Sequence, residues 1–187
     1  MPYPCRTTKN WIDWDRVVQS IVPMSGDKNT VAGVVDRSEP VSEELVIEYR
    51  TIIKTWQDAN YDLGKIEWYD YYPGDHFDIE IQNTFAKIVE AVPKRVFISE
   101  VMPGRCVPYH FDVEDEEQEW LKEGNLVRYV CFIDKPKFGH VFLFKNICFY
   151  NREQHEVHQW EHYKDFHAGT NCGTEPYYLF HFLGVKR

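Results

Sequence analysis

The second half of the chain is a series of short apolar segments separated by turn-forming residues. After Pro93 come "RVFISEVMPG", "LVRYVCFID", "HVFLFKNICFY", "HEVHQW" and "PYYLFHFLGV", each rich in β-branched and aromatic residues and bounded by Gly, Pro, Asn or Asp. Such segments are typical of β-strands. Because they follow one another without helical crossovers, the series favours a sandwich or a jelly roll.

The first half has a different pattern. "PVSEELVIEYRTIIKTW", with Pro40 near its start, and "IEIQNTFAKIVEAVP", which Pro93 is expected to end, place apolar residues at helical spacing. The stretch "MSGDKNTVAGVVDRSEPVS" is polar and rich in turn formers, which predicts a loop. Helices followed by strands predict an α+β fold that is mainly β.

A chain of 187 residues is long enough for one domain with a sizeable core and short for two. We therefore expect residues 1–187 to form a single domain. In this arrangement residues 1–93 are a helical and loop-rich support, and residues 94–187 are a jelly-roll core. The hydrophobic content of 43% excludes a disordered chain, because this much apolar surface can offset the entropy lost on folding.

Charge and cysteine content limit the partners and the compartment. A net charge of −9 argues against nucleic acid or an anionic membrane as the main partner, since both would be repelled. The five cysteines are widely spaced and form no CxxC motif, which indicates reduced thiols in a cytoplasmic protein. No apolar run approaches membrane-spanning length, and the N-terminus has no apolar block of signal-peptide type.

One short motif points to a metal. "PYHFD" contains His110 and Asp112, which would share one face if the motif lies on a strand. A third ligand must come from elsewhere, and "WEHYKDFHAGTNCG" offers His167 at the edge of a Gly/Asn turn. Two histidines and one carboxylate with open positions suit non-haem Fe(II) and the activation of O₂.

The order of these motifs resembles a known family. "PGRCVPYHFD", a strand containing Arg128, "GHVFLF" and finally "HAGTN" before the last strand are similar to the Fe(II)/2-oxoglutarate-dependent oxygenase superfamily. Its prolyl 4-hydroxylase and aspartyl/asparaginyl β-hydroxylase branches are the most similar, over about residues 95–187. The resemblance implies a double-stranded β-helix, or cupin-like jelly roll, with Fe(II) held by His110, Asp112 and His167. It also implies 2-oxoglutarate as cosubstrate and hydroxylation of a C–H bond in a peptide side chain or a small metabolite.

The chain departs from the family at the position that binds the cosubstrate. The family usually has an arginine in the last strand, and this chain has Tyr177 there. We predict that Arg128 binds the distal carboxylate of 2-oxoglutarate, since its planar fork suits a carboxylate, and that Tyr177 adds a hydroxyl. Lys145 and His181 are reserve candidates. Replacing Arg128 or Tyr177 should leave the iron affinity without cosubstrate unchanged.

Other interpretations remain open. His155, His158 and His162 in "HEVHQWEH" include a spacing that fits zinc on a helix, although we expect them to be surface or edge-strand residues. The acidic run "EDEEQEW" is either a solvated short helix or a lid beside the metal. The whole chain could also be a non-catalytic jelly-roll or cupin-like binding or structural protein, or a cupin-type metalloenzyme that does not use 2-oxoglutarate.

Overall fold

The computed structural model describes residues 6–7, 12–21, 26–30, 43–112, 117–135, 137–149, 153–160 and 165–186. The helices are α1 (Trp14–Ile21), α3 (Glu43–Asp58), the 3-10 helix η1 (Leu63–Lys65), α4 (Ile79–Val89) and α5 (Glu117–Glu123). One group of strands comprises β1 (Arg6–Thr7), β2 (Asp27–Thr30), β3 (Glu67–Tyr71), β4 (Val92–Val101), β6 (Asn125–Phe132), β9 (Glu156–Trp160) and β11 (Tyr177–Lys186). The other comprises β5 (Cys106–His110), β7 (His140–Phe144), β8 (Ile147–Phe149) and β10 (His167–Asn171).

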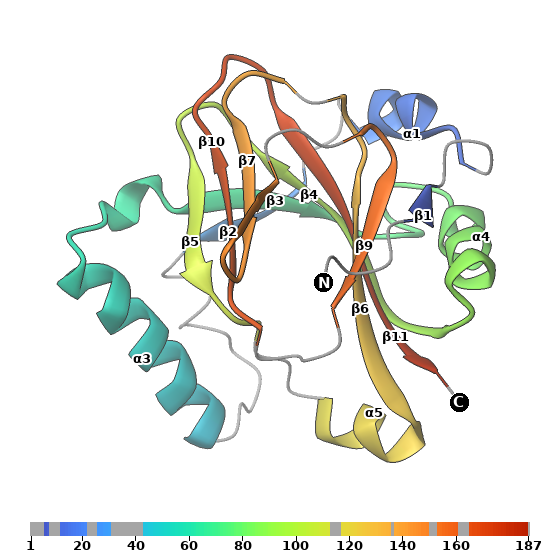
Figure 1. The fold of residues 1–187 in the computed structure, drawn as a ribbon, viewed down its shortest axis with the longest axis horizontal. Coiled ribbons are helices and arrows are strands. Elements are labelled where there is room, and N and C mark those ends of the chain that lie inside the picture. Colours follow the sequence, from blue (N-terminus) through green and yellow to red (C-terminus); the bar gives the residue numbers. More distant parts are fainter. Residues whose placement is uncertain are drawn as a thin grey trace.

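These strands form two facing sheets (Figure 1). The larger sheet has the order β1-β9-β6-β11-β4-β3-β2, and the smaller has the order β5-β10-β7-β8. From β4 onward the strands pair antiparallel in a nested way: β4 with β11, β5 with β10, β6 with β9, and β7 with β8. A chain folded on itself in this manner and rolled into two sheets is a jelly roll. The fold class expected from the sequence is confirmed.

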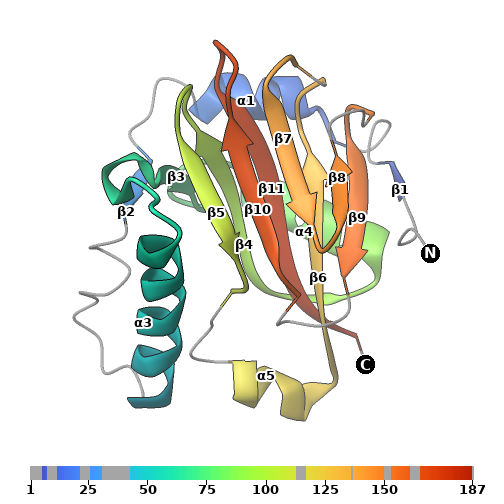
Figure 2. The same ribbon diagram turned by 60° about the vertical axis from the view of Figure 1, so that its left-hand side comes forward.

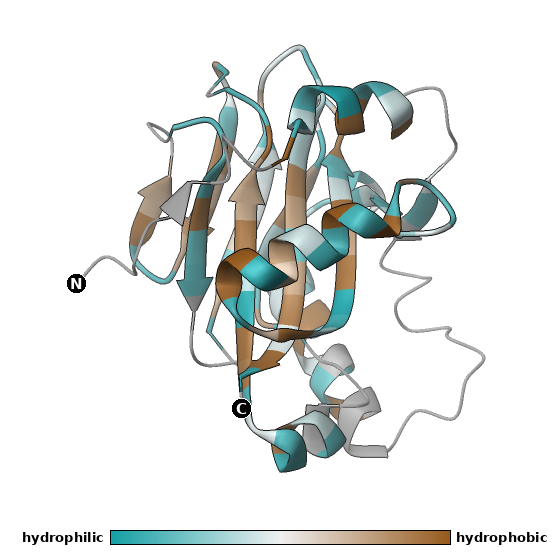
Figure 3. Cartoon of the chain, turned by 90° about the vertical axis from the view of Figure 1, so that its right-hand side faces the viewer, coloured by the Kyte–Doolittle hydropathy of each residue, from teal (hydrophilic) through white to brown (hydrophobic). Residues whose placement is uncertain are grey.

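The larger sheet separates two apolar cores, because successive side chains of a strand point to opposite faces. On β11, Phe180 and Phe182 face outward and pack with Phe85 of α4. Tyr177 and Leu179 of the same strand face the space between the sheets. Figure 3 shows α4 lying across the outer face of the larger sheet. Helices from the first half therefore support the jelly roll, as predicted.

The two predicted helices are present with one different boundary. The first corresponds to α3, apart from residues 40–42, which lie outside the described residues. The second corresponds to α4, which ends at Val89 and not at Pro93. Glu90 adopts a left-handed conformation with φ of 55°, and its amide bonds to the carbonyl of Ala86, so the chain turns directly into β4. Pro93 is part of β4, beside an irregularity of the β4–β11 pairing, where a missing amide proton is tolerated.

Three segments differ from the expectations. Within the segment predicted as a loop, residues 27–30 form β2, which pairs with β3. The segment "HVFLFKNICFY" makes two strands, because Lys145 takes a left-handed turn with φ of 50°. "HAGTN" forms β10 and not a turn, since it pairs with β5 on one side and with β7 on the other. Pairing on both sides outweighs the low β propensity of Ala and Gly.

Two further observations concern the cysteines and the helices. Cys106, Cys131, Cys148 and Cys172 are free thiols. No helix among the described residues is both long and apolar enough to span a membrane.

A buried carboxylate gives a test of the packing around the larger sheet. Glu100 of β4 is 9% exposed and accepts hydrogen bonds from the hydroxyls of Tyr71 (2.6 Å) and Tyr178 (2.7 Å). We predict that Tyr178→Phe lowers the free energy of unfolding by about 1–3 kcal/mol, because one carboxylate oxygen loses its donor. Urea denaturation measures this loss. Tyr61→Phe, at a position that is 45% exposed, is the matched control. A loss equal to that of the control would contradict the importance of the bond.

Candidate metal centre

The pairing of β5 with β10 brings two histidines face to face. His110 is the last residue of β5 and pairs with His167, the first residue of β10. Their ring centres are 4.5 Å apart. Asp112 lies two residues beyond the end of β5, and not on the strand as expected. Its Oδ1 is 3.6 Å from Nε2 of His110 and 3.5 Å from Nε2 of His167. The three residues predicted as ligands are therefore close together.

The imidazole rings are held in the tautomer that a metal requires. Nδ1 of His110 lies 2.7 Å from the carbonyl oxygen of Pro108, and Nδ1 of His167 lies 3.1 Å from that of Asp165. A carbonyl can only accept, so each Nδ1 carries the proton and donates it. In the neutral ring Nε2 then has a free lone pair, and in both residues it is directed toward Asp112.

Asp112 is held from its other side by Arg128. Nη1 of Arg128 donates to Oδ2 of Asp112 at 3.0 Å. Arg128 lies in the middle of β6, and its side chain is 3% exposed, whereas that of Asp112 is 30% exposed. Burial by itself would raise the pKa of Asp112. The charges of His167 and Arg128, together with hydrogen bonds to His110 and His167, outweigh it and hold this pKa well below its usual range.

The pKa values of two histidines at the site, His167 and His181, are shifted in opposite directions. Burial lowers the pKa of His167, but the neighbouring Asp112 carboxylate raises it more, and the net shift is upward. His181 of β11 stacks on Phe97 with ring centres 4.7 Å apart. Burial lowers the pKa of His181 to about 3, although Asp112 opposes this. His181 is therefore neutral near pH 7 and supplies no positive charge.

The other two candidates for cosubstrate binding are Lys145, which has an ion-pair partner, and Tyr177, which lies four positions from His181 on β11. Lys145 is 47% exposed, and its ammonium forms an ion pair with Asp165 at 2.8 Å. Tyr177 is fully buried, and its ring centre is 4.9 Å from that of His140. It precedes His181 by four positions on β11, which corresponds to roughly 13 Å along an extended strand. Its role toward a cosubstrate stays a prediction.

The competing histidines are not part of this cluster. His158 of β9 packs against Phe132 and Phe149, and its Nε2 is 2.9 Å from a carboxylate oxygen of Glu156. His155 is buried just before β9, and His162 lies outside the described residues. The expectation of surface or edge-strand residues is wrong for His155 and His158, because both are buried and β9 lies between β1 and β6. Within the described part of the chain, His110, Asp112 and His167 are the one group whose His, Cys, Asp or Glu ligand atoms all lie within 4.8 Å of one another.

This donor set fits a divalent ion. Metal–ligand bonds to imidazole and carboxylate are about 2.1 Å long, so two ligand atoms on one ion can be up to about 4.2 Å apart. The two distances from Asp112 Oδ1 to the imidazoles fall within this limit. Two neutral nitrogens and one carboxylate on the same side of an ion leave its other side open. His110, Asp112 and His167 would hold such an ion.

The acidic run is described only in part. Residues 113–116 lie outside the described residues, and residues from Glu117 onward form α5. Trp120 of α5 is partly buried, and the guanidinium carbon of Arg95 is 6.0 Å from its ring centre. Figure 2 shows α5 at the end of the barrel toward which β5 runs. A lid function for this run stays a prediction.

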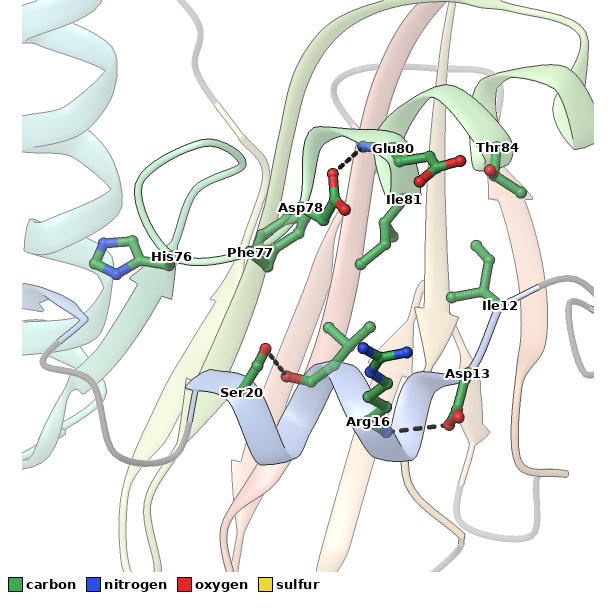
Figure 4. Close-up of a pocket in the computed structure, with 11 residues that line it drawn as sticks. Ile12, Asp13, Arg16, Ser20, His76, Phe77, Asp78, Glu80, Ile81 and Thr84 are labelled. Atoms are coloured by element: carbon green, nitrogen blue, oxygen red, sulfur yellow. Dashed lines mark hydrogen bonds between the residues drawn. The ribbon is translucent and has the colours of Figure 1, made fainter.

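A hollow of about 670 Å³ lies between α1 and the start of α4, and none of the three candidate ligands lines it (Figure 4). Two carboxylates that line it accept hydrogen bonds from backbone amides close by in the sequence. Asp13 accepts a hydrogen bond from the amide of Arg16 at 3.1 Å, and Asp78 accepts one from the amide of Glu80 at 2.8 Å. Both carboxylates cap a helix N-terminus. The hollow contributes nothing to the metal centre.

Comparison with known proteins gives distant structural similarity. No protein-family model and no curated protein sequence matches the chain. A prolyl-4-hydroxylase from Pseudomonas putida aligns over 93% of this chain and 100% of its own, with 11% identity and a TM-score of 0.43. A viral collagen prolyl hydroxylase from Paramecium bursaria Chlorella virus 1, solved with 2-oxoglutarate, aligns over 88% and 98%, with 13% identity and a TM-score of 0.43.

A predicted oxalate decarboxylase from Thermotoga maritima aligns over 64% of this chain and 81% of its own, with 10% identity and a TM-score of 0.39. At such scores the assignment of the jelly roll rests on the strand order and the nested pairing. The structure thus defines a jelly-roll protein with a candidate two-histidine, one-carboxylate metal centre.

Metal binding is the first test of this centre. We predict that replacing His110, Asp112 or His167 by alanine abolishes stoichiometric binding of Fe(II) or Co(II), because each removes one of three ligands. Calorimetric titration without oxygen measures the binding, and circular dichroism checks the fold. His158→Ala is the matched control, since His158 faces the same interior but lies outside the cluster, and it should bind metal normally. Full binding by the His167→Ala protein would rule out the assignment.

The metal affinity should also depend on pH. A metal binds neutral imidazole, and the raised pKa of His167 means that a proton must be displaced even somewhat above pH 6.5. The low pKa of Asp112 keeps this carboxylate ionised throughout that range. Affinity for Co(II) should therefore rise from about pH 6 to about pH 8, by up to about tenfold per pH unit below the pKa of His167. A constant affinity over this range would contradict His167 as a ligand.

Proposed function

We propose that this chain is an Fe(II)- and 2-oxoglutarate-dependent dioxygenase that hydroxylates a C–H bond in a peptide side chain or a small metabolite. The observation that carries the proposal is the arrangement of His110, Asp112 and His167, with both Nε2 atoms directed at one carboxylate oxygen. Iron with 2-oxoglutarate and O₂ supplies the oxidant in enzymes of this class. The resemblance of the sequence motifs supports the same choice.

The residues of the chain have distinct tasks in this proposal. His110, Asp112 and His167 hold the ion on one side and leave the other side for the cosubstrate and O₂. Phe142 and Phe144 of β7 and Val130 of β6 are buried in the core between the sheets, where they exclude water. We further propose a single domain in which residues 1–93 support the catalytic core of residues 94–187.

A dicarboxylate in this interior needs a positive group, because an unpaired buried charge is costly. Among the described residues, Arg128 is the one buried Lys or Arg. Its guanidinium carries five N–H donors in a planar fork, a geometry that suits a carboxylate. Arg128 therefore stays our candidate partner for 2-oxoglutarate, with the Tyr177 hydroxyl as the weaker one.

A second candidate function is a metalloenzyme that uses the same centre without 2-oxoglutarate. Two observations favour it. Tyr177 occupies the position where the related family usually has an arginine, and it lies in an apolar cluster with Val101, Phe132 and Leu179. Arg128 already contacts a carboxylate within the protein.

Spectroscopy without oxygen distinguishes the two candidates. We predict a weak visible charge-transfer band only when Fe(II) and 2-oxoglutarate are both present, followed by 2-oxoglutarate-dependent succinate formation once O₂ is admitted. Tyr177→Phe should weaken 2-oxoglutarate binding by only about 0.5–1.5 kcal/mol, since it removes one neutral hydrogen bond. Metal binding without any response to 2-oxoglutarate would favour the second candidate. Absence of metal binding would leave a non-catalytic jelly-roll protein.

A further inference from the structure

Arg128 contacts the candidate metal ligand itself. Its side chain comes from β6, in which every residue from Leu126 to Phe132 is buried, and it reaches across the interior to Asp112. Nη1 lies 3.0 Å from Oδ2, whereas Oδ1 lies 3.5–3.6 Å from the two histidine Nε2 atoms. The two oxygens of one carboxylate therefore have separate partners.

Separate partners for its two oxygens affect how a carboxylate binds a metal ion. A free carboxylate can bind an ion through one oxygen or through both, and its terminal torsion is soft. A charge-assisted hydrogen bond from a buried guanidinium is short and directional, so it restricts that torsion and occupies one oxygen. The remaining oxygen is then left for the metal alone.

We propose that Arg128 is the positioning residue of Asp112: it holds Oδ2 and thereby makes Asp112 a ligand through Oδ1 only. The guanidinium also balances the carboxylate charge, so a bound divalent ion keeps its positive charge toward the open side. Such an ion favours an anionic ligand. This inference rests on the proposed metal centre and does not depend on 2-oxoglutarate.

The inference differs from cosubstrate anchoring in a measurable way. An arginine that only anchors a cosubstrate leaves the metal affinity unchanged when no cosubstrate is present. An arginine that positions a ligand changes the affinity and the geometry of the metal site under the same conditions. Replacement of groups that orient metal ligands typically costs about 10- to 100-fold in metal affinity.

Arg95 provides a matched control on the same sheet. Leu183 of β11 pairs with Arg95 of β4 on one side and with Arg128 of β6 on the other. Residues in register across a sheet share a face, so the side chains of both arginines leave the sheet on its interior face. The two arginines lie on the strands on either side of β11. The guanidinium of Arg95 lies near Trp120 of α5. Its replacement removes an equal charge from the same face.

The experiment titrates wild type, Arg128→Gln, Arg128→Lys and Arg95→Gln with Co(II), without 2-oxoglutarate, and follows visible absorption. Arg128→Gln should lower the Co(II) affinity about 10- to 100-fold and alter the visible bands, because Asp112 is no longer held. Arg128→Lys should recover part of the affinity, since an ammonium can still donate to Oδ2. Arg95→Gln should match wild type in both measurements. Oxalate should bind more weakly to the Co(II)-loaded Arg128→Gln protein than to wild type.

The other outcomes distinguish a failure of the inference from a failure of the metal centre or of the proposed cosubstrate. Wild-type affinity and spectrum in Arg128→Gln, or in Arg128→Lys alone if the glutamine variant does not fold by circular dichroism, would overturn it while the metal centre stands. An equal loss in Arg95→Gln would show a general effect of charge. Failure of wild type to bind Co(II) would remove both the centre and the inference. Failure to use 2-oxoglutarate, with the Arg128 results as expected, would overturn only the proposed cosubstrate.

Discussion

The antiparallel pairing of β5 with β10 is the constraint on which the candidate site depends. It places His110 opposite His167 in one register position, although the two residues are far apart in the sequence. A shift of one residue would turn one of the rings to the outer face of the sheet. The register is supported on the other side of β10, where His167 pairs with Phe144 of β7. The relative position of the two candidate histidine ligands is thus set by backbone hydrogen bonds.

Around this pair, neighbouring groups restrict the three candidate ligands. Backbone carbonyls of Pro108 and Asp165 accept the Nδ1 protons, and Arg128 holds the distal oxygen of Asp112. Each contact restricts a ring or carboxylate that would otherwise be free to rotate, so little ordering remains to be done when a metal arrives. In a chain with a net charge of −9, the buried guanidinium of Arg128 is stabilised by the partly buried carboxylate of Asp112.

Much of the architecture could be predicted from local patterns. The helical spacing before Pro93 and the apolar segments after it predict a mainly β fold supported by helices, which the structure confirms. Local patterns did not predict the secondary structure of segments whose conformation depends on pairing with distant strands. "HAGTN" contains small residues that read as a turn, yet two neighbouring strands make it β10. The end of α4 was misplaced for a similar reason: Pro93 marks a break in a helical pattern, but Glu90 had already ended the helix.

The sequence by itself determined the types of ligand and their local spacing, since His110 and Asp112 are close on any extended chain. It also determined the two apolar faces of each strand, because alternation is a property of the backbone. The order of the motifs predicted His167 as the third ligand, but only the tertiary structure decided that His167 lies opposite His110 and that Arg128 contacts Asp112, because both contacts depend on strand register between distant segments. The same is true of His181, whose neutrality results from burial against Phe97 and not from its neighbours in sequence.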